Sequence, residues 1–175
     1  MGTLVDIRVL KVEATTDAGR RVEIIRGVSF EIAPGEIVAL IGESGSGKTT
    51  IALTLLGYTR TGCRITGGSV RVDGRDMAAL SEKERAKVRG VAVSYVPQSA
   101  AAAFNPAQRI MDQVIEITRI HELMPRAQAE AKAIDLFRAL SLPSPETIGG
   151  RYPHELSGGQ LQRLSAAMAL IGDPK

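Results

Sequence analysis

The chain has 175 residues, of which 44% are hydrophobic and 23% charged, so its length and composition are those of one soluble globular domain. Its 22 basic and 19 acidic residues leave a net charge of +3, too small and too dispersed to indicate a nucleic-acid-binding surface. A single cysteine excludes an internal disulfide framework, and no apolar run approaches the ~20 residues of a membrane span.

The first part of the chain has the pattern of antiparallel β-structure. The alternation in Leu4–Val12 predicts a strand with Val5, Ile7 and Val9 on one face. Two more short strands are predicted between residues 22 and 32.

The next stretch predicts a buried strand, a glycine-rich loop and a helix start. Ile37–Ile41 is apolar at every position, which is typical of a strand covered on both faces. Gly42–Thr49 then fits the phosphate-binding pattern G-x-x-x-x-G-K-[ST]. Its glycines permit backbone angles that turn successive N–H groups inward, and the positive end of the following helix dipole points at the same phosphates. Lys48 can reach the β- and γ-phosphates, and the hydroxyl of Thr49 can bind Mg²⁺.

We therefore predict a nucleotide site in this loop rather than a chance glycine-rich turn, because a strand precedes the pattern and a helix follows it. The predicted site comprises Gly42, Glu43, Ser44, Gly45, Ser46, Gly47, Lys48, Thr49 and Thr50.

After the loop, a helix is expected over about Lys48–Leu56, and a strand over Ser69–Val72 that ends in an Asp-Gly hairpin turn. Ser81, followed by two glutamates, indicates another helix start. Val91–Val96 is again mostly apolar and predicts a second buried strand, which leads directly to Gln98.

The last third of the chain predicts helices over Ile110–Leu123, over Arg126–Leu140, and from Ser157 to about Ile171. Ser157 is a good N-cap, and the two glycines after it leave backbone N–H groups uncovered at a helix N-terminus. Taken alone, this pattern favours an ordinary capped helix. Its position about a hundred residues after a phosphate loop, with Gln98 between them, favours a second phosphate-binding surface.

These three elements resemble the nucleotide-binding domains of ABC transporters, and the resemblance covers nearly the whole chain. Gly42–Thr49 is similar to the family's Walker A loop, and Gln98 to its Q-loop glutamine. The LSGGQ signature is matched in full by Leu156, Ser157, Gly158, Gly159 and Gln160. Phe104-Asn105-Pro106 and His154-Glu155-Leu156 further resemble the ATP-binding subunits of oligopeptide, dipeptide and nickel importers.

The resemblance implies an α/β fold of the P-loop NTPase type, with a parallel-sheet core, an N-terminal antiparallel β layer and a helical signature subdomain. The expected boundaries are 1–103 for the β layer and Walker A core, 104–157 for the helical subdomain, and 158–175 for the signature helix.

The implied function is the ATP-binding, energy-coupling subunit of an ABC importer for peptides or similar small solutes. Thr49 and Gln98 would hold Mg²⁺, and Gln98 would also sense the attacking water. The signature residues would serve the ATP of a second ABC ATPase domain paired head to tail. Integral membrane permease subunits would dock near Gln98 and the helical subdomain, and would hold the protein at the cytoplasmic face of the membrane. Nucleic acid is not an expected partner.

Two departures from the family pattern bear on these expectations. The loop Asp17–Arg21 lacks the aromatic residue that usually stacks on adenine, so adenine would be held by an arginine or weakly. The Walker B Asp-Glu and the switch histidine have no counterpart up to Lys175. We therefore expect the N-terminal part of a longer ATP hydrolase, able to bind ATP and barely able to hydrolyse it. The alternatives are a soluble ABC-type ATPase of translation or repair, and a non-catalytic nucleotide-binding module.

Overall fold

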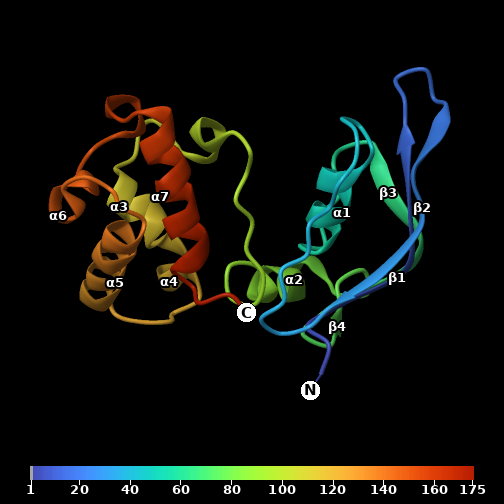
Figure 1. The fold of residues 1–175 in the computed structure, drawn as a ribbon, viewed down its shortest axis with the longest axis horizontal. Helices are drawn as coiled ribbons and strands as arrows, with labels where there is room; N and C mark the ends of the chain where they lie inside the picture. Colours follow the sequence, from blue (N-terminus) through green and yellow to red (C-terminus); the bar gives the residue numbers. More distant parts are fainter. Residues whose placement is uncertain (1) are drawn as a thin grey trace. The chain divides into compact units, whose positions relative to one another are not determined.

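The structure is a computed structural model that describes residues 2–175 and divides them into two compact units (Figure 1). Unit 1 comprises residues 2–93 together with Lys175, and unit 2 comprises residues 94–174. Unit 1 holds an apolar core around the β-sheet, and unit 2 holds another among its helices.

Unit 1 is organised on a four-stranded antiparallel sheet in the order β2-β1-β3-β4. The strands are β1 (Val5–Thr15), β2 (Arg21–Ile32), β3 (Cys63–Val72) and β4 (Arg75–Asp76). The predicted antiparallel start of the chain is confirmed, although the two short strands expected between residues 22 and 32 are one continuous strand. The Asp-Gly hairpin turn is also confirmed, because it joins β3 to β4.

The prediction that Val9 shares a face with Val5 and Ile7 is wrong. Val9 lies in a β-bulge with φ of 46° and is 54% exposed, and the pairing register shifts between Ile7 and Leu10. Leu10 is therefore fully buried in its place. Gly68 on β3 permits the bulge, because a Cβ there would lie 2.3 Å from the carbonyl oxygen of Arg8. The extra residue keeps the buried face of β1 apolar on both sides of the bulge, at Ile7 and at Leu10.

The two strands predicted for a parallel core do not form. Ile37–Ile41 has no strand structure, and Ile37 and Ile41 are 97% and 94% exposed. Val91–Val96 makes only one isolated parallel bridge, between Arg89 and Val93. An extended segment becomes a strand only when a neighbour satisfies its backbone groups, and none of the four described strands pairs with either segment.

Two short helices complete unit 1: α1 (Lys48–Thr54) and α2 (Glu82–Val88). Helix α1 lies over one face of the sheet and buries Ile51 in the sheet's core (Figure 1). The predicted start of α2 is confirmed, because Ser81 is its N-cap and forms a capping box with Glu84.

Unit 2 is helical. Its elements are the 3-10 helices η1 (Ala100–Ala103) and η2 (Pro153–Glu155) and the α-helices α3 (Ile110–Val114), α4 (Glu116–Ile120), α5 (Arg126–Ala139), α6 (Pro145–Ile148) and α7 (Gly158–Leu170). The single helix predicted over Ile110–Leu123 is thus two short helices that meet at Ile115. The predicted helices α5 and α7 are confirmed to within a residue or two, and they bury Phe137 and Leu164 in one core.

Candidate functional site: a phosphate loop and a capped signature helix

Two glycines of the loop in unit 1 adopt left-handed backbone angles. Gly45 and Gly47 have φ values of 83° and 90°, a region that glycine adopts without strain. The N–H of Ser46 donates to the carbonyl of Glu43 at 3.2 Å, and the N–H of Ile51 donates to that of Gly47 at 2.9 Å. The loop therefore closes as a turn and passes directly into α1, so all nine predicted nucleotide-binding residues lie in one loop and one helical turn.

Two of the loop glycines also lie close to other side chains. A Cβ on Gly42 would lie 2.8 Å from Oγ of Ser46. A Cβ on Gly47 would lie 2.4 Å from Cδ1 of Ile25, a core residue of β2. The sheet thus fixes the end of the loop from which α1 begins.

The Lys48 side chain folds back over the loop. Its Nζ donates to the carbonyl oxygens of Gly42 at 2.8 Å and Glu43 at 2.7 Å, and to Oγ of Ser46 at 3.3 Å. An ammonium group held there is a point charge at the loop mouth, where it can bind a phosphate oxygen. Thr49, one residue into α1, is exposed.

The signature residues of unit 2 lie at the N-terminus of α7. Ser157 is the N-cap: its Oγ accepts from the N–H of Gln160 at 3.3 Å, and Oε1 of Gln160 accepts from the N–H of Ser157 at 2.8 Å. Gly158 and Gly159 are exposed, and a Cβ on either would meet no atom within 4 Å. Leu156 is half-buried against the core of unit 2. The signature is therefore a rigid, capped helix end with an open outer surface.

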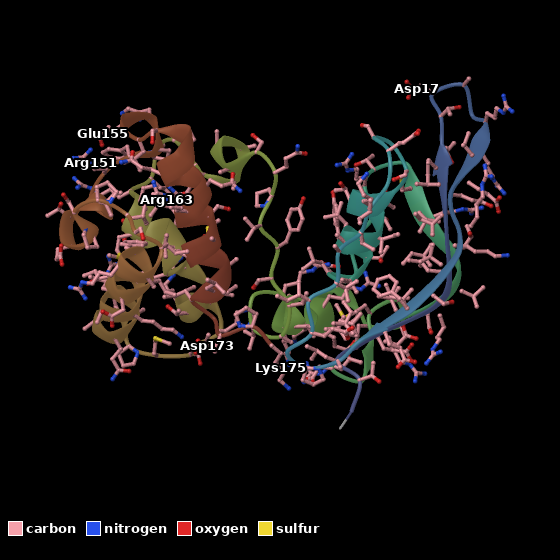
Figure 2. The ribbon with its side chains drawn as sticks, viewed as in Figure 1. Asp17, Arg151, Glu155, Arg163, Asp173 and Lys175 are labelled. Atoms are coloured by element: carbon pink, nitrogen blue, oxygen red, sulfur yellow. The ribbon has the colours of Figure 1, made fainter. Side chains whose placement is uncertain are left out.

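Arg163 on α7 supports this helix end, a role that the sequence analysis did not predict (Figure 2). Its Nε donates to the carbonyl of Gly159 at 3.3 Å, and its Nη1 donates to that of Ser141 at 2.5 Å. Ser141 follows the end of α5, where the last carbonyls of a helix lack partners within the helix. No local sequence pattern indicates this role, because Ser141 lies 22 residues before Arg163 in the chain.

Gln98 is exposed and lies in a segment without regular structure. The neighbouring Pro97 carbonyl accepts from Nε2 of Gln162 on α7 at 3.4 Å. Gln98 and the signature thus belong to unit 2, whereas Thr49 belongs to unit 1, and their joint Mg²⁺ site stays a prediction. Within residues 2–175 there is no group of three or more His, Cys, Asp or Glu side chains that could hold a metal ion by itself.

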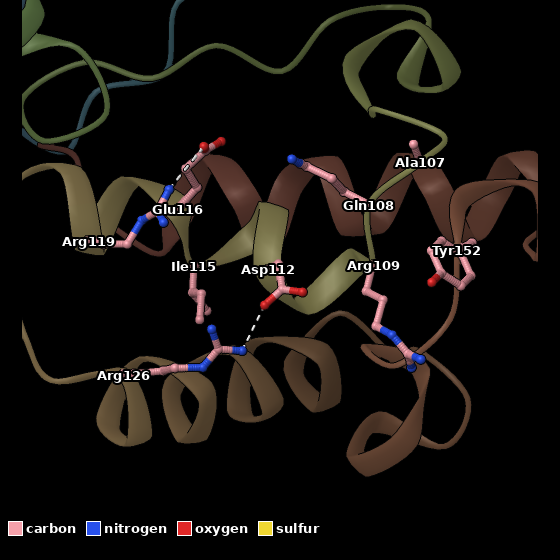
Figure 3. A pocket seen from close by; sticks show the side chains of 9 residues that line it. All are labelled: Ala107, Gln108, Arg109, Asp112, Ile115, Glu116, Arg119, Arg126 and Tyr152. Atoms are coloured by element: carbon pink, nitrogen blue, oxygen red, sulfur yellow. Dashed lines mark hydrogen bonds and ion pairs between the residues drawn. The ribbon is translucent and has the colours of Figure 1, made fainter.

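Unit 2 also has a polar cavity of about 420 Å³ that the sequence analysis did not predict (Figure 3). It is lined by Ala107, Gln108, Arg109, Asp112, Ile115, Glu116, Arg119, Arg126 and Tyr152. Arg126 donates to Asp112 and to Glu130, at 2.7 Å in each case, and these bonds raise the pKa of its guanidinium above the usual value. The guanidinium of Arg109 lies 5.4 Å from the ring centre of Tyr152, in cation–π geometry.

The family profile described as "ABC transporter" matches residues 25–175. The chain belongs to the ABC transporter family. Among the described helices, none is both long enough and apolar enough to cross a membrane.

Curated members of the family share about a third of this chain's residues. The oligopeptide transport ATP-binding protein AppD of Bacillus subtilis is 37% identical over 86% of this chain and 46% of its own length. OppD of Escherichia coli is 34% identical over 98% of this chain and 50% of its own length. The probable D,D-dipeptide transport ATP-binding protein DdpD of Escherichia coli is 37% identical over 88% and 47%. The chain thus spans about half the length of these relatives.

Among solved structures, a dimeric post-hydrolysis state of the ATP-binding cassette MJ0796, bound to ADP and Pi, matches with a TM-score of 0.82. The match covers 97% of this chain and 70% of that chain, at 22% sequence identity. At this identity the likeness shows the fold, which is that of an ABC ATPase cassette. It confirms the predicted α/β class, although the parallel-core strands expected at Ile37–Ile41 and Val91–Val96 do not form in the described residues.

Proposed function

We propose that this chain is part of the ATP-binding subunit of an importer for peptides or similar small solutes. The observation that carries the proposal is the phosphate loop, in which Lys48 lies over the loop carbonyls at the start of a helix. The transport names of relatives such as AppD and OppD support the peptide class of solute.

In this proposal the nine loop residues from Gly42 to Thr50 bind the phosphates of ATP. The hydroxyl of Thr49 and the amide oxygen of Gln98 bind Mg²⁺, which would neutralise charge on the phosphates. Residues 1–103 form the nucleotide-binding core, residues 104–157 the helical subdomain, and residues 158–175 the signature helix.

The signature, in turn, serves a second ABC ATPase domain that pairs head to tail with this one. The open surface at Gly158 and Gly159 supports this role, because a partner's phosphate can approach the helix end without meeting a side chain. Gln160 is used in the capping box and keeps the helix end in place.

Permease subunits dock on unit 2 near Gln98 and the helical subdomain, which holds the protein at the cytoplasmic face of the membrane. The polar cavity supports this assignment, because it offers charged groups of both signs to a docking segment. Arg109 is the cavity cation that forms no ion pair within residues 2–175.

The intact protein hydrolyses ATP, whereas the 175-residue chain binds ATP without hydrolysing it. Its loop supplies a phosphate cradle, and no carboxylate is assigned to position or deprotonate the attacking water. A complete site would also need the signature of a second domain.

The experiment is a pair of assays on the 175-residue chain, on the full-length protein, and on Lys48→Ala in each. Calorimetry should show ATP binding by both wild-type proteins and a loss of about 10- to 100-fold in affinity on Lys48→Ala, as for a hydrogen bond to a charged group. Turnover above the Lys48→Ala control should occur only in the full-length protein. Equal ATP affinity in wild type and Lys48→Ala would refute the site, and Lys48-dependent turnover by the 175-residue chain would refute its inactivity.

A further inference from the structure

The segment that carries Gln98 is held to the rest of unit 2 at few points. Residues 94–98 have no regular structure, and in the described part of the chain they make one hydrogen bond within the unit. That bond runs from Nε2 of Gln162 on α7 to the carbonyl oxygen of Pro97, at 3.4 Å. The Pro97 carbonyl belongs to the peptide bond that leads into Gln98, so the bond sets the orientation of that peptide plane.

The other flank of Gln98 also rests on α7. Ala100 begins η1 two residues later and is 5% exposed, and η1 packs against α7 in the core of unit 2. Gln98 and Ser99 therefore span two points that are both fixed on the helix whose N-terminus carries the signature. That helix is itself rigid, because it is capped at Ser157 and buries Leu161 and Leu164.

We propose that Gln162 is a positioning residue that ties the Gln98 segment to the signature helix. The proposal rests on the proposed function, in which Gln98 binds Mg²⁺ and the signature meets a partner's ATP. A displacement of α7 on contact with the partner then moves the peptide bond before Gln98 with it. Gln162 thereby makes the position of Gln98 depend on whether the signature is engaged.

The test uses the full-length ATPase assembled with its transporter. Gln162→Glu keeps the size of the side chain and removes the amide donor. Gln128→Glu is the matched control, because Gln128 is an exposed residue of α5. We expect Gln162→Glu to lower kcat by about 3- to 10-fold, the range of one hydrogen bond, and to leave KM for ATP within about 2-fold. Gln128→Glu should match wild type, and Gln162→Lys, which retains an N–H donor, should recover most of the lost turnover.

A double-mutant cycle with Gln98→Ala shows whether Gln162 acts through Gln98. If it does, the double variant is no slower than Gln98→Ala alone, because the position of an absent side chain no longer matters. Additive losses, an unaffected Gln98→Ala, or equal kcat in Gln162→Glu and Gln128→Glu would each overturn the proposal.

Backbone mobility separates this inference from the proposed function. In full-length protein without nucleotide, the order parameters from NMR relaxation of residues 94–96, 98 and 99 should be lower in Gln162→Glu than in Gln128→Glu, whatever the protein hydrolyses. Unchanged order parameters would overturn the tie between Gln162 and Pro97. Turnover that survives Lys48→Ala would instead refute the proposed function and leave the mobility result to decide the tie.

Discussion

The two glycine-containing motifs of this chain use glycine in different ways. In the phosphate loop, Gly45 and Gly47 have positive φ, and a Cβ on Gly47 would lie within 2.4 Å of a core side chain. In the signature, Gly158 and Gly159 have helical backbone and open space where a Cβ would be. The loop glycines are therefore needed by this chain's own backbone, whereas nothing within unit 2 requires the signature glycines. A glycine that the fold itself does not require indicates contact with another molecule.

The two motifs also differ in the structural elements that hold them in place. The segment before the phosphate loop, Ile37–Ile41, is exposed and has no strand partner. The signature begins a helix of 13 residues whose inner side is buried at Leu161 and Leu164. A helix satisfies its backbone internally, whereas a strand depends on neighbours that can lie far away in the sequence.

The strongest way to break this comparison is to place a bulky cation on the signature. Ser157→Arg should leave this chain's own ATP affinity nearly unchanged, because in the proposed dimer Ser157 serves the partner's nucleotide. It should prevent the mutant signature from completing a partner's site, because positive charge is added where the helix dipole is already positive. Full-length Ser157→Arg, mixed with a partner domain that lacks its phosphate-loop lysine, should still trap ATP in the one complete composite site.

The control places both changes on one chain. In the mixed dimer of full-length Lys48→Ala, Ser157→Arg protein with a wild-type partner, no composite site is complete, so this dimer should trap no ATP. If Ser157 were only a helix cap, both mixtures would trap ATP equally, and the variant would merely lose about 1 kcal/mol of stability.

A pair of glycine substitutions should act in opposite directions on stability. Gly47→Ala should lower the free energy of unfolding by about 1–3 kcal/mol, because alanine is strained at a φ of 90° and its Cβ would displace Ile25. Gly159→Ala should raise it by up to about 1 kcal/mol, since alanine is the better helix former and meets no atom. Urea unfolding measures both values.

Gly159→Ala also distinguishes the stability of the fold from the assembly of the dimer. Gly159→Ala should weaken ATP-dependent pairing of full-length domains although the fold is more stable, because the added methyl group lies on the surface that is proposed to meet the partner. A Gly159→Ala protein that pairs as well as wild type would remove the argument that this glycine is kept for an outside contact.

The sequence predicted well those elements whose partners are close in the chain. The capped starts of α2 and α7, the hairpin between β3 and β4, and the turn of the phosphate loop each depend on residues within about six positions of one another. Ser81 and Ser157 were recognisable because a helix N-cap is a local event.

The errors have non-local causes. Val9 follows the alternation of β1 but lies in a bulge, which Gly68 on another strand permits. The strand expected at Ile37–Ile41 was inferred from a continuous apolar run before the phosphate loop, and such a run does not supply a hydrogen-bonded neighbour. The roles of Arg163 and Gln162 depend on carbonyls 22 and 65 residues away, so neither was visible in a linear pattern.

The smallest predicted effect compares the capping boxes of α2 and α7. In unit 1 the box joins Ser81 to Glu84, whose carboxylate accepts from the Ser81 hydroxyl at 2.6 Å and from its N–H at 2.8 Å. These hydrogen bonds hold the pKa of Glu84 below its usual value of 4.5. In unit 2 the same position is Gln160, which does not titrate. A lowered pKa in the folded state means that the stabilisation is complete above the unfolded value and is lost as the pH falls through the folded value.

Hydrogen exchange at the first turns of α2 and α7 checks this difference in pH dependence. It is measured between about pH 6 and pH 3 and corrected for the intrinsic pH dependence of exchange. Protection of α2 should fall with pH in wild type and become nearly independent of pH in Glu84→Gln, whereas protection of α7 should not change with pH in either protein. The reciprocal variant Gln160→Glu should give α7 the pH dependence that α2 loses, because the box geometry is the same in both helices. If α7 in Gln160→Glu remained insensitive to pH, the carboxylate would not be the group that confers the pH dependence on a capping box in this protein.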